Sequence, residues 1–145
     1  MLKIVKVALQ EYGKAGIIGN ENNPEIVKYF HEIGHKWVND DETPWCAAFL
    51  NWVLLKCNIT GTGKLNARSF LEIGQEVTSP TLGDLVILWR IQKEGPYGHS
   101  GIYIAESKHL LYILGGNEDN MVRIKAYPKE NLLGYRRLLD KETGC

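Results

Sequence analysis

One stretch near the middle of the chain decides the fold: TPWCAAFLNWVLLKC, residues 43–57. Thr43 followed by Pro44 is a typical helix start, with a hydroxyl side chain at the N-cap and proline at the first helical position. From Trp45 to about Cys57 the predicted helix is apolar almost all round, interrupted by one asparagine and one lysine. A helix of this kind belongs in the middle of a fold, so we expect the other elements to surround it.

The sequence before this helix also has helical spacing. A first segment ends at Gly13 and repeats apolar residues at helical intervals, namely Leu2, Val5, Leu9 and Tyr12. Asn23 and Pro24 then repeat the start signal. An apolar stripe follows them, consisting of Ile26, Phe30, Ile33 and Trp37. After the central helix, a short helix is expected over residues 66–73.

The pattern changes to strands after Pro80. Runs rich in β-branched and aromatic residues, separated by turn residues, predict strands over 83–91, 99–105, 110–114, 121–127 and 134–139. No helical pattern lies between them, so the sheet is expected to be mainly antiparallel. Helices first and sheet second indicate an α+β fold, and we expect a single domain over residues 1–145.

Composition narrows the function. The chain has 145 residues with 17 basic and 17 acidic side chains, so its formal net charge is zero. This balance gives no bulk attraction to nucleic acid or to anionic lipid, and we expect neither as a partner. No apolar run reaches the roughly 18 residues of a transmembrane helix. The N-terminal sequence lacks the pattern of a secretory signal peptide, so we expect synthesis in the cytoplasm.

Three cysteines are present, namely Cys46, Cys57 and Cys145. This odd, sparse count excludes a disulfide scaffold and an all-cysteine zinc site, and it leaves room for one functional thiol. In the predicted helix Cys46 stands at the third position, where the backbone N–H groups are unpaired and the helix dipole is positive. Both features favour a thiolate and stabilise an oxyanion, as a cysteine nucleophile requires. A buried core cysteine is the alternative, and the helix start alone leaves both open.

A nucleophilic cysteine also needs a base. His99 stands at the beginning of a predicted strand, between glycines that allow close approach. The next predicted strand ends in Gly115-Gly116-Asn117. If the two strands form a hairpin, Asn117 lies near His99 and its amide can hold the imidazole in one tautomer, as in Cys-His-Asn enzymes.

Four motifs in this order resemble a family of small phage and prophage lysins, which belongs with the NlpC-type and CHAP-type cysteine amidases and peptidases of papain-like fold. They are ETPWCAAFLNW at 42–52, GDLV at 83–86, GHSGIY at 98–103 and LGGN at 114–117. The opening helix, ARSF at 67–70 and LGYR at 133–136 extend the resemblance over most of the chain.

The resemblance implies a bacteriolytic enzyme that cuts an amide bond in the peptidoglycan stem peptide, either as an endopeptidase or as an N-acetylmuramoyl-L-alanine amidase. By position, Cys46 is the nucleophile, His99 the general base and then acid, and Asn117 the orienting residue. The family usually has glutamine where this chain has Glu118, and a carboxylate there can compete with Asn117 for the third role.

We further expect four residues to line the substrate groove, namely Trp45, Tyr97, Gly98 and Glu118. The chemistry implied by the resemblance uses no cofactor and no metal. A monomer is expected, reaching the cell wall through holin-type lysis, a phage particle or a secretion system.

A competing motif is His31-Glu32-Ile33-Gly34-His35, which matches the H-E-x-x-H signature of zinc metallopeptidases. On a helix starting at Pro24, both histidines point away from the apolar stripe and toward solvent, whereas a catalytic zinc needs ligands that converge in a supported cleft. Two alternatives to a cysteine hydrolase therefore stay open: a zinc metallopeptidase through this motif, and a non-catalytic wall-binding module.

Overall fold

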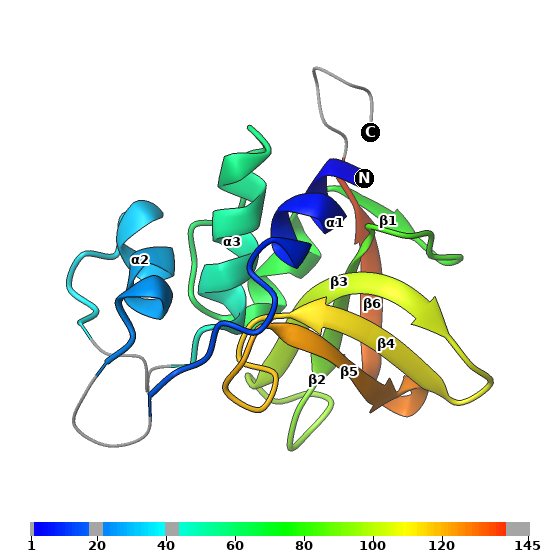
Figure 1. Cartoon of the computed structure of the whole chain (residues 1–145). Coiled ribbons are helices and arrows are strands. Elements are labelled where there is room, and N and C mark those ends of the chain that lie inside the picture. Colours follow the sequence, from blue (N-terminus) through cyan, green and yellow to red (C-terminus); the bar gives the residue numbers. More distant parts are fainter. Residues whose placement is uncertain (1, 18–21, 40–43, 139–145) are drawn as a thin grey trace.

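The computed structural model of the chain describes residues 2–17, 22–39 and 44–138. Helices α1, α2 and α3 come first, followed by the 3-10 helix η1 and a six-stranded sheet (Figure 1). The short 3-10 helix η2 connects the last two strands, β5 and β6. The helices are α1 (Leu2–Leu9), α2 (Pro24–Glu32), α3 (Cys46–Lys56), η1 (Ala67–Glu72) and η2 (Lys129–Asn131). The strands are β1 (Gln75–Val77), β2 (Leu85–Trp89), β3 (Gly98–Glu106), β4 (Leu110–Gly115), β5 (Arg123–Pro128) and β6 (Leu132–Arg137).

The sheet is antiparallel throughout, with strand order β1-β6-β2-β3-β4-β5. Strands β3 and β4 form the predicted hairpin, and Ile102 pairs with Leu114 near the end where His99 and the Asn117 turn lie. Helix α3 packs on β3 and β4, while α1 and α2 pack on α3. Figure 1 shows the helices gathered on one side of the sheet. The predicted α+β class is therefore confirmed.

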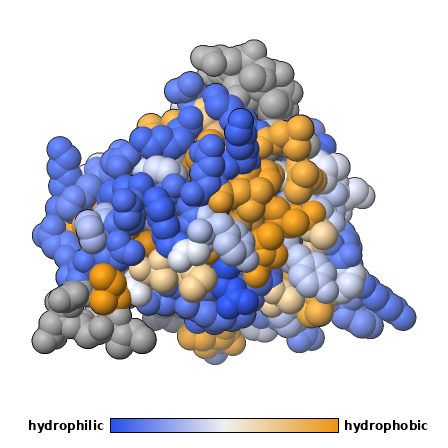
Figure 2. Space-filling view, in the orientation of Figure 1, coloured by the Kyte–Doolittle hydropathy of each residue, from blue (hydrophilic) through white to orange (hydrophobic). Residues whose placement is uncertain are grey.

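Apolar side chains are buried on both faces of the sheet. Toward the helices, β2 and β3 contribute Leu85, Ile87 and Ile102 to a core that includes most of α3. A second cluster on the other face joins Val86 and Leu88 of β2 with residues of β3, β4 and β6. In Figure 2, hydrophilic residues cover much of the visible surface, and apolar residues gather in a patch beside α1 and over the neighbouring sheet.

The start of α3 differs from the prediction. Trp45 is the N-cap, with φ −123° and ψ 16°, and its carbonyl accepts the first helical bond from Phe49 N–H. Cys46 is therefore the first helical residue rather than the third, and Pro44 precedes the helix. The predicted N-cap, Thr43, lies outside the described residues. The reason is tertiary packing, because the fully buried Trp45 ring is stacked on Tyr29.

The first two helices are shorter than their apolar spacing suggests. Helix α2 ends at Glu32, and Gly34 then turns the chain with φ 101°, so Trp37 leaves the predicted stripe and is 69% exposed. Helix α1 ends at Leu9 and buries Ile4, Val5 and Ala8, whereas Leu2 and Leu9 of the predicted stripe are exposed and Tyr12, also exposed, follows the helix. Strand β1 was not predicted. No helix in the described ranges is long and apolar enough to cross a membrane.

Candidate active site

Cys46 lies where the start of α3 meets strand β3. Its side chain is nearly buried, and its Sγ accepts hydrogen bonds from the backbone N–H groups of Ser100 and Ala47. Ser100 directly follows His99 in β3. The bond from Ser100 therefore joins the predicted nucleophile to the strand that carries the predicted base.

The pKa of the Cys46 thiol is raised, which is the opposite of the sequence prediction. Burial is the largest cause, and the charge of Glu118 acts in the same direction. The two backbone N–H donors and Arg90 lower the pKa but do not compensate. A helix start favours a thiolate only where solvent or a cation also supports the charge. At rest Cys46 is a thiol and requires a base to react.

His99 is paired with a carboxylate that is also buried. The Nε2 atom of His99 contacts Oε1 of Glu118, and the two residues are 4% and 0% exposed. Burial, with the cations Arg90 and Lys125, lowers the pKa of His99 to about 3. Burial raises the pKa of Glu118 to about 8. Because each group resists carrying an isolated charge, the pair shares one proton near neutral pH.

Tyr127, which sequence reasoning missed, completes the pair. Its ring stacks on the imidazole of His99, with centroids 5.1 Å apart and an interplanar angle of 26°. Its hydroxyl hydrogen-bonds to Glu118, a contact that lowers the pKa of that carboxyl. Burial and the nearby carboxylate raise the pKa of Tyr127 itself, so it stays a hydrogen-bond donor. Only the pairing of β5 with β4 brings this residue near His99, and no sequence signal marks it.

A tight turn after β4 holds Glu118 in place. Asn117, Asp119 and Asn120 have φ values of 57°, 54° and 63°, in the left-handed region that asparagine and aspartate tolerate best among non-glycine residues. The Glu118 N–H closes the turn on the Met121 carbonyl at 2.9 Å. This backbone path directs Glu118, rather than its neighbours, toward His99.

Gly116 lets the same turn approach the start of α3. A Cβ at this position would lie 2.6 Å from the Phe49 Cβ and 2.8 Å from the Trp45 ring, closer than packed atoms tolerate. The Trp45 indole N–H also donates to Asn120 Oδ1 at 3.3 Å. The turn that positions Glu118 is therefore fitted against the residue that precedes Cys46.

The predicted orienting residue, Asn117, lies near His99 but does not hold it. Both residues line the same cavity, yet no hydrogen bond joins the Asn117 amide to the imidazole in the described part of the chain. The carboxylate of Glu118 occupies that position instead. The family that the sequence resembles usually has glutamine at this position, and the carboxylate of Glu118 in its place was the sequence signal for this exchange.

The four residues predicted to line the substrate groove lie outside the lining of the cavity beside His99. Trp45 is fully buried and belongs to the core rather than to a groove, because its ring packs on Tyr29. Tyr97 is 61% exposed, and Gly98 sits so close to the Leu88 carbonyl that a Cβ would lie 2.6 Å from it. Neither lines the cavity beside His99. Glu118 contacts His99 from a fully buried position, so it is not a groove residue either.

A cavity of about 630 Å³ opens beside His99. Its walls combine cations, an acid, amides and aromatic rings from the end of β2, the 117–119 turn, β5 and η2. The residues lining it are Leu88, Trp89, Arg90, Ile91, His99, Asn117, Asp119, Lys125, Tyr127 and Asn131. The imidazole therefore faces a polar space large enough for a peptide segment.

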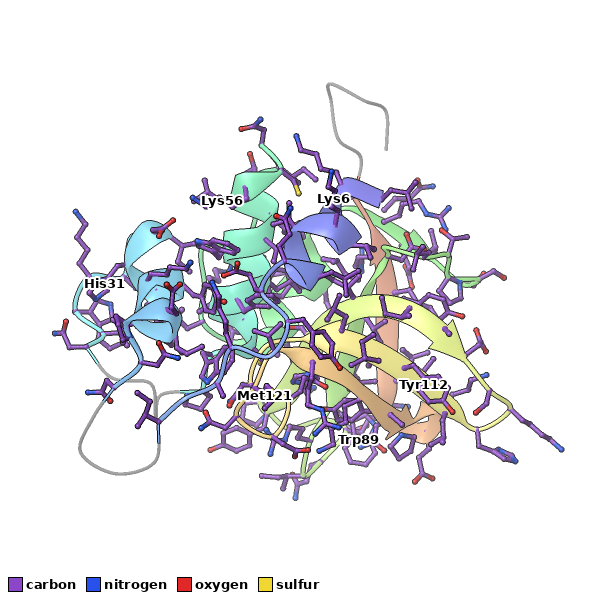
Figure 3. The ribbon with its side chains drawn as sticks, in the orientation of Figure 1. Lys6, His31, Lys56, Trp89, Tyr112 and Met121 are labelled. Carbon is purple, nitrogen blue, oxygen red and sulfur yellow. The ribbon has the colours of Figure 1, made fainter. Side chains whose placement is uncertain are left out.

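The H-E-x-x-H motif does not form a metal-binding arrangement. His31 Nε2 bonds to the Val38 carbonyl at 2.5 Å, and His35 Nε2 bonds to the Gly63 carbonyl at 2.7 Å. Glu32 accepts from Trp52 and Lys56. Because α2 ends at Glu32, His35 is not on the helix at all. In Figure 3, His31 lies far from Trp89, which lines the cavity.

No family model matches the sequence, and no curated protein matches it. Among solved structures, the chain is similar to a crystal structure from Staphylococcus aureus subsp. aureus Mu50, described as "similar to lipoprotein, NLP/P60 family". The TM-score is 0.54 at 20% identity over 93% of this chain. The fold resembles the NlpC/P60 fold. The chain spans 40% of the length of that protein, and the likeness concerns the fold.

Burial of Glu118 predicts a pH-dependent stability. Its pKa rises from 4.5 in the unfolded chain to about 8, so between these values the folded chain holds a proton that the unfolded chain has released. The stabilising contribution of Glu118 is complete below pH 4.5 and is lost as pH rises to about 8. Glu118→Gln cannot titrate and lacks this loss.

We therefore expect the free energy of unfolding of the wild type, minus that of Glu118→Gln, to fall across this pH window. The slope is about 1.4 kcal/mol per pH unit at its steepest. Urea unfolding at closely spaced pH values measures it, and the subtraction removes titrations common to both proteins. A difference that does not change with pH would show that Glu118 has an ordinary pKa in the folded chain.

Proposed function

We propose that this protein is a cysteine peptidase or amidase that cuts an amide bond in peptidoglycan, with Cys46 as nucleophile. One observation carries the proposal: the first residue of a buried helix, Cys46, is hydrogen-bonded to the backbone beside a histidine that is itself paired with Glu118. A nucleophile, a base and a group that orients the base are the parts that such a reaction needs. The NlpC/P60-like fold supports the same conclusion.

The reaction begins with proton transfer from the Cys46 thiol to His99. The reactive state is the one in which Glu118 is ionised and its carboxylate accepts a hydrogen bond from the Nε2–H of His99, because only then does the other ring nitrogen carry no proton and act as acceptor. The resulting imidazolium lies against the Glu118 carboxylate, which stabilises its charge. Burial disfavours a permanent thiolate at Cys46. In the proposed reaction the thiolate forms only when the substrate is bound.

The thiolate then attacks the carbonyl carbon of the amide. Unpaired N–H groups at the start of α3, including that of Cys46, stabilise the oxyanion. His99 gives its proton to the departing amine, which leaves an acyl thioester on Cys46. Water, deprotonated by His99, hydrolyses the thioester, releases the carboxylate product and restores the thiol. All steps use this chain's own residues.

The substrate we propose is a peptidoglycan stem peptide, cut either within the peptide or at its bond to muramic acid. The cavity beside His99 offers cations, an acid and amides to such a polar peptide. With zero net charge, the protein gains nothing from bulk attraction to an anionic wall, so this shaped site supplies recognition. We propose a monomer that reaches the wall by release or injection from the cell in which it is made.

The test is the replacement of Cys46. Cys46→Ala should abolish release of soluble muropeptides from purified cell walls, because Cys46 is the thiol that is hydrogen-bonded to the strand carrying the base His99. Mass spectrometry of the products measures this and identifies the bond that the wild type cuts. Cys57→Ala is the matched control: Cys57 follows the last turn of the same helix and is fully buried, so its loss affects stability rather than turnover.

Two outcomes would overturn the proposal. Full activity of a folded Cys46→Ala protein would exclude the nucleophile. Sedimentation of the wild type with peptidoglycan, without any released product, would identify the chain as a non-catalytic wall-binding module. Circular dichroism of the variants ensures that a loss of activity is not a loss of folding.

The assignment of the third residue is tested by comparing two variants. Glu118→Gln keeps the shape but removes the carboxylate that stabilises the imidazolium, so we expect kcat to fall by about 10²- to 10⁴-fold. Asn117→Gly removes the amide and tolerates the positive φ, and we expect it to lose less than about tenfold. Steady-state kinetics on soluble muropeptides measures both. A larger loss of kcat in Asn117→Gly than in Glu118→Gln would assign the orienting role to Asn117 instead.

A further inference from the structure

The loop that joins β2 to β3 contains an isoleucine in an unfavourable position. Ile91 has φ 70°, and its neighbours are joined across it by a hydrogen bond from Gln92 N–H to the Arg90 carbonyl at 2.7 Å. A bond between residues two apart around a positive φ defines the rarer, strained form of γ-turn. Glycine or asparagine suits such a site, whereas a β-branched side chain is an outlier there.

Ile91 is also poorly placed for the stability of the fold. Its side chain is 77% exposed, the largest value among the exposed large hydrophobic residues that the structure describes. It gains little from burial and carries a strained backbone, so folding alone does not account for it. It lines the cavity beside His99, and strained residues at a cleft point to contact with a ligand.

The surrounding structure holds this strained turn in one conformation. Arg68 of η1 donates three hydrogen bonds to carbonyl groups of the loop: to Tyr97 at 3.0 Å, Lys93 at 2.8 Å and Gln92 at 2.9 Å. The Arg90 N–H also donates to the Tyr97 carbonyl at 3.1 Å. One side chain thus fixes the far side of the loop, so that Ile91 stays at the cavity.

Arg90 gives the turn a second property. Its side chain is exposed on the cavity wall and makes no ion pair with any carboxylate in the described ranges. Lys125, the other cation of the cavity, is instead paired with Asp119 at 2.7 Å. The turn therefore presents an uncompensated guanidinium next to an apolar side chain, which matches a substrate that carries a carboxylate beside an apolar group.

We propose that the turn Arg90-Ile91-Gln92 is a preformed specificity element, in which Ile91 packs against an apolar side chain of the substrate peptide and Arg90 binds its carboxylate. Arg68 is a positioning residue that acts through the loop. The proposal rests on the proposed hydrolase function and adds to it the residues that select the peptide. Holding the loop before binding lowers the ordering cost that the substrate must offset.

The test combines kinetics with thermal stability, using soluble muropeptides as the probe. Ile91→Gly relieves the positive φ and removes the apolar contact, so we expect KM to rise about tenfold with kcat nearly unchanged, while Tm rises by about 3 °C. Ile91→Val keeps an apolar side chain and should keep the wild-type KM. Leu82→Ala, at an exposed leucine that does not line the cavity, is the control and should leave KM unchanged.

Arg68→Ala separates positioning from general stability. It frees the loop, so KM should rise as in Ile91→Gly, but Tm should fall because three hydrogen bonds are lost. A purely structural Arg68 would lower Tm without changing KM. An unchanged KM in Ile91→Gly, in a protein that cleaves muropeptides normally, would overturn this inference and leave the hydrolase intact.

If the wild type does not cleave muropeptides, the hydrolase proposal fails and the inference is tested by binding. Isothermal titration of muropeptides into the wild type and Ile91→Gly should then still show about tenfold weaker binding by the variant. Equal affinities, or no binding by either protein, would overturn the specificity element as well.

Discussion

The contact between the imidazole of His99 and the carboxylate of Glu118 is the interaction on which the rest of the site depends. Both groups are buried, where an isolated charge on either one would be costly. The contact between them offsets this cost because the two groups share one proton. The left-handed residues of the 117–120 turn aim Glu118, the absence of a Cβ at Gly116 brings that turn against α3, and Tyr127 covers the pair. The same close fit places Cys46 beside the strand that carries His99.

This arrangement changes how the thiol is activated. At an exposed helix start, the dipole and free N–H groups alone can generate a thiolate. Here burial prevails over those effects and keeps Cys46 protonated. Reactivity must then come from the base, and a base with a buried carboxylate partner is suited to the task because its imidazolium form is stabilised as it appears. In the proposed mechanism the thiol stays protonated at rest, because burial raises its pKa, and His99 activates it.

Much of the fold follows from short-range sequence patterns. The apolar helix, the β3–β4 hairpin and the antiparallel order were predictable because helical and strand periodicities are strong in those segments. The helix boundaries were not predictable. Trp45 precedes α3 instead of lying within it, because its ring stacks on Tyr29. Helix α2 ends before His35, because the chain turns at Gly34. The placement of Glu118 and Tyr127 depends on a turn and on strand pairing, which adjacent residues do not encode.

The most direct test of the central claim is to follow alkylation of each cysteine by iodoacetamide, by peptide mass mapping, while cell-wall hydrolysis is measured on the same samples. We expect activity to be lost in proportion to modification of Cys46, muropeptides to slow this modification, and modification of the other two thiols to have no such relation to activity. Full hydrolytic activity in protein whose Cys46 is completely alkylated would contradict it.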